Sequence, residues 1–475
     1  MSIAAALTPA RRRTGRGAEL GLLVFAGIIV TAALVIVELN QNQALHWELL
    51  YYGGGYLAVF AVAHLLTRAL APYADPLLLP LVALLNGIGL VMIYRLDLAA
   101  KARDADAAAQ APLQLLWTGI ALLFFLAVLL VVRDHTTLQQ YSYTLALLGV
   151  VFLAIPAALP SRFSEVNGAK IWIKIPGLLS IQPSEFAKIA LIVFAAAFLV
   201  SKRTLLSTAG KRFLGLVLPR ARDLGPLVVL LAVALAVLVF GNDLGTALLL
   251  FGVLLVMVYL TTGRVSWLII GLLAFAGGAV LAYQLFAHLR VRVDIWLHPF
   301  ADPLNKGYQL VQSLFGLGTG GIFGTGLGAG RPDIVPFAST DFITAALGEE
   351  LGLVGLSAIL LCYLLLVGRG LRTALAAKDN FGSLLAAGLS FAIALQVFII
   401  VGGVTRLIPL TGLTTPFLSY GGSSLLANYI ILALLLRISD SSRRPVVGRL
   451  PRAPRPAPLT QERTEVLPAL GGDGA

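Results

Sequence analysis

Apolar runs long enough to cross a membrane recur along the whole of this 475-residue chain. A helix needs about 18 or more apolar residues to span the hydrocarbon layer, and such a run satisfies its own backbone hydrogen bonds in lipid only as a helix. The chain is 58% hydrophobic and 12% charged, which excludes an ordinary soluble domain. The sequence therefore predicts an all-α polytopic membrane protein, a bundle of about 12 transmembrane helices. The expected spans are 20–37, 50–66, 77–94, 113–132, 143–159, 184–200, 226–240, 244–260, 267–286, 342–367, 384–401 and 423–436.

Lysine and arginine are distributed unevenly between the two sides of this bundle. The segments on the side of the termini carry 23 of these residues, and the opposite segments carry 11. The positive-inside rule then places both termini in the cytoplasm and the polar stretch 288–340 outside it. The net charge of +12 implies no nucleic acid partner, because most basic residues flank apolar spans and face a lipid surface.

The C-terminal residues 438–475 are rich in Pro and Arg and have no apolar period, so they are expected to be a disordered cytoplasmic tail. The single cysteine, Cys362, rules out an intramolecular disulfide.

The loop 288–340 is the strongest candidate for a functional segment, because long loops without a strong secondary-structure period are usually functional or disordered. It contains Asp302, followed by proline, and eight glycines within 316–330. A nicotinamide cofactor is rejected, since no strand precedes the glycines. The glycines allow either close backbone packing or amide donation to a phosphate, and the sequence leaves both open.

Several charged residues stand at or inside apolar spans. Glu185 and Lys188 are three residues apart, so on a helix they share a face and can pair, either as a structural ion pair or beside a polar cavity. Asp243 precedes an apolar run and has the pattern of a helix N-cap. The adjacent pair Glu349 and Glu350 requires an interior partner, for packing or for function.

Six strings, in this order, resemble the SEDS family of bacterial cell-wall polymerases, the RodA and FtsW family. They are Asn167-Gly168-Ala169-x-x-Trp172, Gln182-Pro183-Ser184-Glu185-x-x-Lys188, Asp243-Leu244-Gly245-Thr246-Ala247, Asp302-Pro303-x-x-x-Gly307-Tyr308-Gln309, Thr340-Asp341-Phe342-Ile343 with Gly348-Glu349-Glu350-Leu351-Gly352, and Pro416-Phe417-x-Ser419-Tyr420-Gly421-Gly422-Ser423. The spacing is more similar to the elongation members than to the division members. The resemblance implies a ten-helix core over residues 77–437, which includes the extracytoplasmic loop 288–340. It leaves out residues 1–76, which are expected to form an N-terminal cytoplasmic segment and two additional transmembrane helices, and the tail 438–475.

The resemblance implies peptidoglycan glycosyltransfer from lipid II, a disaccharide-pentapeptide on undecaprenyl diphosphate, at the outer face of the cytoplasmic membrane. It makes Asp302 the catalytic residue, and a carboxylate there can take the proton of the acceptor 4-hydroxyl as a β-1,4 bond forms. The departing diphosphate needs cations, and a bound Mg or Mn ion is a candidate cofactor. The expected substrate-binding residues are Arg162, Lys170, Trp172, Glu185, Lys188, Asp243 and Lys306.

The family's expected partner is a class B penicillin-binding protein, a transpeptidase with one membrane helix. Two alternatives to the polymerase remain. A lipid II flippase would use the intramembrane charges as a translocation path but would not need the long outer loop. A scaffold that only recruits a wall synthase would use the same charges for helix packing.

Overall fold

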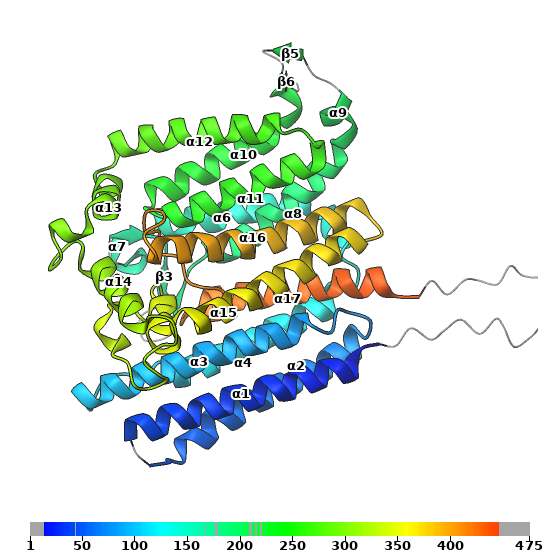
Figure 1. The fold of residues 1–475 in the computed structure, drawn as a ribbon. Coiled ribbons are helices and arrows are strands. Elements are labelled where there is room, and N and C mark those ends of the chain that lie inside the picture. Colours follow the sequence, from blue (N-terminus) through cyan, green and yellow to red (C-terminus); the bar gives the residue numbers. More distant parts are fainter. Residues whose placement is uncertain are drawn as a thin grey trace, which may run out of the picture. The chain divides into compact units, whose positions relative to one another are not determined.

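The computed structural model describes residues 14–42, 44–166, 168–175, 179–208, 211–213, 216–218 and 221–445. The residues from Arg13 to Arg443 form one compact unit. Most of this unit consists of long helices that run roughly side by side (Figure 1). The connecting segments with α7, β3, α13 and α14 gather at one end of these helices, and α9, β5 and β6 lie at the other end.

The helices of the described residues have the following bounds: α1 (Arg16–Asn42), α2 (Glu48–Leu70), α3 (Leu78–Arg103), α4 (Ala111–Val131), α5 (Thr137–Gln140), α6 (Ser142–Ala158), α7 (Ser161–Ser164), α8 (Ser184–Ser201), α9 (Arg203–Thr208), α10 (Ala221–Phe240), α11 (Leu244–Thr262), α12 (Ser266–Leu285), α13 (Ala287–Leu297), η2 (Pro299–Ala301), α14 (Tyr308–Gly320), η3 (Pro332–Ile334), α15 (Ile343–Ala376), α16 (Asn380–Val404) and α17 (Gly422–Arg443).

All twelve expected spans coincide with apolar helices. Ten helices of the described residues are long and apolar enough to cross a membrane, and the shorter apolar helices Ser142–Ala158 and Leu224–Phe240 account for the other two. The predicted fold class is confirmed, because a run of apolar residues of this length fixes both the helix and its position along the chain.

The strands within the described residues form three short antiparallel hairpins. They are β1 (Glu165–Val166) with β2 (Ala169–Lys170), β3 (Ile173–Ile175) with β4 (Leu179–Ile181), and β5 (Lys211–Phe213) with β6 (Leu216–Leu218). Glu165 pairs with Lys170 in the first hairpin and Lys174 pairs with Ser180 in the second. The first two hairpins connect α7 to α8, at the end of the bundle where α13 and α14 also lie (Figure 1).

The helices differ greatly in how much of their surface the protein covers. The most apolar windows of α3, α8 and α17 are 83%, 83% and 89% buried, whereas that of α12 is 6% buried. An apolar helix that the protein leaves uncovered requires another apolar environment. We therefore expect α12 to face lipid over most of its surface, while α3, α8 and α17 form the interior.

The long helix α15 is interrupted at Gly352, whose φ of 67° and ψ of −172° are not helical. The amides of Leu353 and Val354, which the break leaves without helical partners, donate to the carbonyls of Gly321 (2.9 Å) and Ile322 (3.0 Å). A Cβ on Gly352 would lie 2.2 Å from the amide nitrogen of Gly324. The glycine-rich loop, residues 321–331, therefore fits into the break and packs directly on the backbone of α15.

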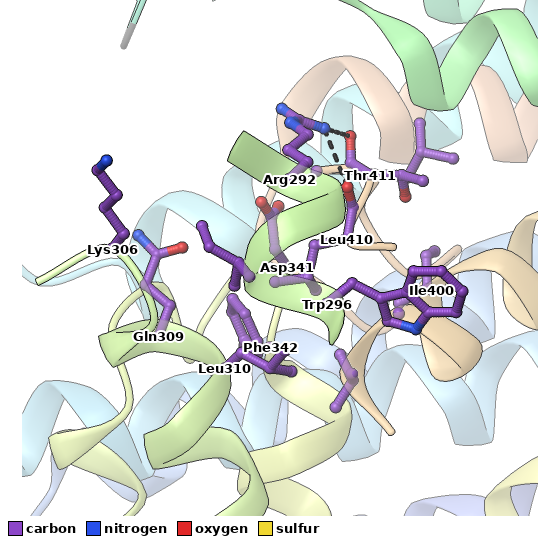
Figure 2. Close-up of a pocket in the computed structure, with 15 residues that line it drawn as sticks. Arg292, Trp296, Lys306, Gln309, Leu310, Asp341, Phe342, Ile400, Leu410 and Thr411 are labelled. Carbon is purple, nitrogen blue, oxygen red and sulfur yellow. Dashed lines mark hydrogen bonds between the residues drawn. The ribbon is translucent and has the colours of Figure 1, made fainter. Parts of the chain in front are cut away.

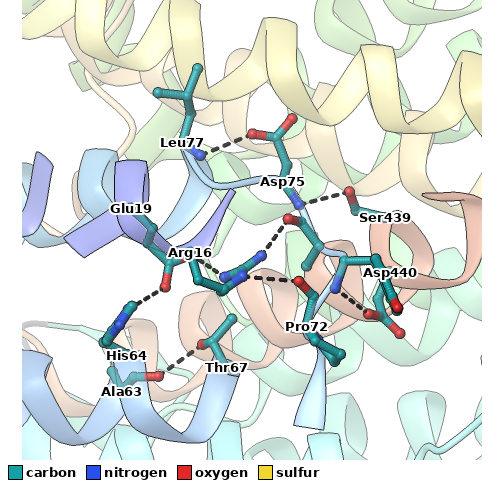
Figure 3. A network of polar contacts seen from close by, with 12 residues as sticks. Arg16, Glu19, Ala63, His64, Thr67, Pro72, Asp75, Leu77, Ser439 and Asp440 are labelled. Carbon is teal, nitrogen blue, oxygen red and sulfur yellow. Dashed lines mark hydrogen bonds and ion pairs between the residues drawn. The ribbon is translucent and has the colours of Figure 1, made fainter. Parts of the chain in front are cut away.

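Two expectations about irregular segments were wrong. The outer loop contains two helices, α13 and α14, with bounds Ala287–Leu297 and Tyr308–Gly320. The predicted tail from residue 438 begins with the last turns of α17, which continue to Arg443. The amide of Tyr73 donates to Asp440 Oδ1 (2.9 Å) and the amide of Asp75 donates to Ser439 Oγ (3.0 Å), so contacts with a distant loop stabilise these turns (Figure 3). Residues 446–475 of the predicted tail lie outside the described residues.

Candidate active site

Asp302 lies in a tight turn between η2 and α14, on the surface of the outer segment and only partly buried. Asn305 Nδ2 donates to Asp302 Oδ1 (2.9 Å), and the Lys306 amide lies 3.4 Å from Oδ2. These donors, Asn305 first, hold the pKa of Asp302 below its usual range. A Cβ on Gly307 would lie 2.2 Å from the carbonyl oxygen of Pro299, so the turn closes this tightly only with glycine. The geometry therefore presents an ionised carboxylate at the protein surface.

A cavity of about 240 Å³ opens beside this turn (Figure 2). Lys306 and Gln309 reach it from the turn and the start of α14, and Arg292 and Trp296 reach it from one face of α13. The remaining lining residues belong to α13, α14, the segment just before α15, the end of α16 and the loop after α16: Ile295, Leu310, Asp341, Phe342, Ile400, Gly403, Val404, Leu410, Thr411, Gly412 and Leu413. The cavity combines one carboxylate, two cations and apolar walls.

Arg292 joins α13 to the loop after α16. Its Nη1 donates to the carbonyls of Leu410 and Thr411, both at 3.1 Å. Burial lowers the pKa of Arg292, and the carboxylates of Asp243 and Asp341 oppose this effect. Burial also raises the pKa of Asp341 to about 6, against the favourable charge of Arg292. Arg292 is therefore a partly desolvated cation between two carboxylates, one of which lines the cavity.

Asp243 is almost fully buried and caps α11, because its Oδ1 accepts a hydrogen bond from the Thr246 amide (3.0 Å). The predicted N-cap is confirmed. Its other oxygen, Oδ2, accepts a bond from Ser184 Oγ at the start of α8 (3.3 Å). The cap therefore holds the first turns of α8 and α11 together, and its negative charge favours the charged form of Arg292.

Glu185 and Lys188 form the ion pair expected from their spacing, at 2.6 Å and with both side chains buried. Lys188 Nζ also donates to Gln396 Oε1 on α16 (3.0 Å). Gln396 Nε2 in turn donates to the carbonyl of Thr414 (2.8 Å), in the loop that also carries Thr411. A chain of polar groups therefore runs from this intramembrane pair to the loop that lines the cavity.

The three other predicted substrate residues lie apart from the cavity. Arg162 and Lys170 are exposed, and the Arg162 guanidinium lies 4.4 Å from the centre of the Phe163 ring. Trp172 is partly buried, and its amide donates to the carbonyl of Ser164 (3.2 Å). Their segment is linked to the start of α11, because Asn242 Nδ2 donates to the carbonyl of Gly168 (2.9 Å).

Sequence reasoning missed three residues of this region. Asp341 stands directly before an apolar run, a pattern that could have marked it, but its motif alone implied no role for it. Arg292 lies four residues before Trp296, so both share a helical face, but the segment was not expected to be helical. Gln396 gave no signal, because its partner Lys188 is 208 residues away.

The glycine-rich loop supplies its amides to glutamates of α15 rather than to a cavity. Gly328 N donates to Glu350 Oε2 (2.9 Å), and Arg331 N donates to Glu349 Oε1 (2.6 Å). Glu350 also forms a buried ion pair with Arg95 of α3 at 2.9 Å. Of the two roles left open for the glycines, these contacts favour close backbone packing. The partner required by the glutamate pair is Arg95.

A divalent metal ion is the cofactor that the family resemblance implies. Across the part of the chain that the structure describes, no three His, Cys, Asp or Glu side chains are grouped so that they could hold a metal ion. The acidic residue that lines the cavity, Asp341, faces the cation Arg292. Among the described residues that line the cavity, Asp341 is the one carboxylate, and the Mg or Mn ion implied by the resemblance stays a prediction.

Comparison with known proteins agrees with this architecture. Residues 76–444 match the model of the FtsW/RodA/SpoVE cell cycle protein family. The peptidoglycan glycosyltransferase RodA of Mycobacterium tuberculosis is 58% identical over 96% of both chains, and that of Mycobacterium leprae is 55% identical over the same shares. A chain from a study of how a peptidoglycan synthase complex coordinates polymerization and crosslinking superposes with a TM-score of 0.60 at 28% identity, covering 78% of this chain and 99% of that one.

A second solved structure is similar to this chain in its fold. A mutant of the rod shape determining protein RodA of Thermus thermophilus, 24% identical, superposes with a TM-score of 0.53 over 78% of this chain and 99% of its own. The family model covers most of this chain, and the mycobacterial relatives match almost all of it. This chain is therefore a member of the FtsW/RodA/SpoVE family of polytopic membrane proteins.

Proposed function

We propose that this chain is a peptidoglycan glycosyltransferase of the elongation type, which joins lipid II disaccharides through β-1,4 bonds. The observation that carries the proposal is the 58% identity with a relative of that name over 96% of both chains. The described geometry supports it, because the partly exposed Asp302 carboxylate lies on the same turn as Lys306, which lines a cavity with cations and apolar walls. Cations suit the diphosphate of a lipid-linked sugar, and apolar walls suit its polyprenyl chain.

Asp302 is the general base of the reaction. The acceptor 4-hydroxyl loses its proton to this carboxylate as its oxygen attacks the anomeric carbon of the donor. The bond from that carbon to the lipid diphosphate breaks, and the configuration inverts. The donors from Asn305 and Lys306 keep Asp302 ionised, which is the form that a base must have.

The leaving diphosphate gains negative charge, so cations near the cavity stabilise the transition state. Lys306 and Arg292 line the cavity and are the best placed of the basic residues. Lys188 is bonded to Glu185 and Gln396. Arg162 on α7 and Lys170 on β2 lie in the exposed segment between α6 and α8, where they suit the sugar or peptide of the substrate better. Trp172 belongs to the same segment and offers a flat apolar surface to a sugar ring.

The chain works in the bacterial cytoplasmic membrane with both termini in the cytoplasm, and a class B penicillin-binding protein is its partner. The orientation rests on the excess of basic residues on the side of the termini. The partner is supported by the superposed chain, which was studied in a complex that coordinates polymerization with crosslinking.

The test is lipid II polymerisation by the purified protein in detergent, with an Asp302→Asn variant. We expect the wild type to form long glycan strands and the variant to form none, while both keep the same melting temperature. Asp294→Asn, an exposed change on α13, is the matched control and retains activity. Glycan synthesis by the Asp302 variant would remove Asp302 as the base, and movement of lipid II across a bilayer without polymer would favour the flippase.

A further inference from the structure

The two N-terminal helices lie before the region that the family model covers, yet the outer end of α1 contacts the glycine-rich loop of the core. Asn40 Nδ2 donates to the carbonyl of Leu327 (2.6 Å), and Gln41 Nε2 donates to the carbonyl of Gly328. Gly328 has a φ of +80°, and a Cβ there would lie 3.0 Å from the Cβ of Asn40. The last turn of α1 is therefore built against this loop.

The rest of α1 is fixed by packing and by polar contacts. Its buried residues Leu23, Ala26, Val30, Leu34 and Val37 follow a helical spacing, so one stripe of the helix faces the protein. A Cβ on Gly87 of α3 would lie 2.3 Å from Val30, which shows how closely the two helices approach.

The other end of α1 is tied to the start of the core. Arg16 Nε donates to the carbonyl of Pro72 (3.2 Å), and Glu19 bonds both Arg16 and His64 of α2 (Figure 3). Arg16 also donates to the carbonyl of Ala74. Because α1 is held at both ends and packed along one face, it resists deformation, and a shift of one end would also shift the other.

The glycine-rich loop connects this helix to the candidate active site. Gly328, whose carbonyl accepts from Gln41, donates its amide to Glu350, and Arg95 bonds both Glu350 and the carbonyl of Gly330. The loop follows α14, which carries cavity residue Gln309, and precedes the segment that carries Asp341. A displacement of the loop would therefore move two walls of the cavity.

We propose that α1 braces the glycine-rich loop, and that Asn40 and Gln41 are positioning residues that keep α14 and Asp341 in place for the reaction. The contacts by which α1 braces the loop do not depend on the proposed function. The expected effect of these contacts on the rate of the reaction does rest on it. The N-terminal helices then contribute to the function of the core, and their removal increases the mobility of the glycine-rich loop and α14.

The experiment uses the full chain in lipid nanodiscs and measures hydrogen exchange of peptides that cover residues 321–331. The amides of Thr325 and Gly326 donate to carbonyls of α15, so their exchange reports on the loop. We expect the double variant Asn40→Ala with Gln41→Ala to raise loop exchange about tenfold, as the loss of two hydrogen bonds implies. The double variant Asn40→Asp with Gln41→Glu keeps the shape, removes the donors and points carboxylates at carbonyls, so it raises exchange at least as much.

Leu39→Ala, an exposed change on the same turn, is the control and leaves loop exchange unchanged. In lipid II polymerisation, both double variants lower kcat with KM within about twofold of wild type, because the loss is one of positioning rather than of binding. Unchanged loop exchange in both double variants would overturn the brace, and so would an equal rise over all helices. If loop exchange responds while the wild type makes no glycan, the proposed function fails and the brace stands.

Discussion

The ammonium of Lys188 lies 2.6 Å from the carboxylate of Glu185, and both side chains are buried between helices. Lys188 also contacts Gln396, whose amide reaches the loop that lines the cavity. The pair therefore links the interior of the bundle to the candidate active site, and its charges depend on each other for stability.

Replacing Lys188 with methionine is expected to lower the free energy of unfolding by about 3 kcal/mol, because the buried Glu185 carboxylate loses its partner. The double variant Glu185→Gln with Lys188→Met removes both charges and recovers most of this loss. Melting temperatures of the three proteins in one detergent measure the effect. Equal melting temperatures for the single and double variants would show that the ion pair is not what stabilises this site.

Asp341 makes stability depend on pH. Its pKa is raised to about 6 in the folded protein, so the folded state holds this proton more tightly than the unfolded state does. Stability from this group therefore falls as pH rises between about 4 and 6, by about 1–2 kcal/mol after allowance for solvent screening, and is constant above that range. The difference in melting temperature between Asp341→Asn and wild type should grow over this interval, whereas Asp294→Asn should show no such trend.

Some glycines within residues 316–330 occupy positions that only glycine can fill, and others do not. Gly324 has a φ of +83°, and a Cβ there would lie 2.3 Å from the carbonyl oxygen of Glu350. We expect Gly324→Ala to destabilise the protein by about 3 kcal/mol or more, through strain and overpacking. Gly318 lies inside α14 with open space around it, so Gly318→Ala should be neutral or stabilise by up to about 1 kcal/mol. Thermal unfolding that ranks the two variants in the opposite order would contradict the packing of the loop on α15.

Arg406 positions the end of α13, which directly precedes the turn with Asp302. Its Nε donates to the carbonyl of Trp296 (2.8 Å) and its Nη2 to that of Leu297 (2.7 Å). Removing these bonds with Arg406→Ala should lower kcat about tenfold, since small errors in the placement of a catalytic group are costly. Arg406→Lys keeps the charge but not the fork of donors, so it should fall between alanine and wild type.

Arg290→Ala, an exposed change on the same helix, serves as the control for these measurements and keeps the wild-type kcat. Initial rates of lipid II polymerisation at several substrate concentrations separate kcat from KM. A change in KM alone would mean that Arg406 acts on substrate binding rather than on the position of Asp302.

Local signals predicted well wherever the relevant partners are close in sequence. The twelve spans follow from runs of apolar residues, the Asp243 cap from its place before one run, and the Glu185 and Lys188 pair from a spacing of three residues. The helix α13 was missed because its residues have no strong apolar period, and contacts with the loop after α16 stabilise it. The helix α14 does carry an amphipathic pattern, which was a usable signal.

The sequence by itself determined the membrane class, the family resemblance and the choice of Asp302, since each depends on the order of residues along the chain. Only the tertiary structure decided which distant groups meet: Arg95 with Glu350, Arg292 with the loop at Leu410, and Asn40 with Leu327. These pairs are separated by 255, 118 and 287 positions. Their meeting depends on how helices pack against one another, and packing is set by side-chain shape over the whole bundle rather than by any local pattern.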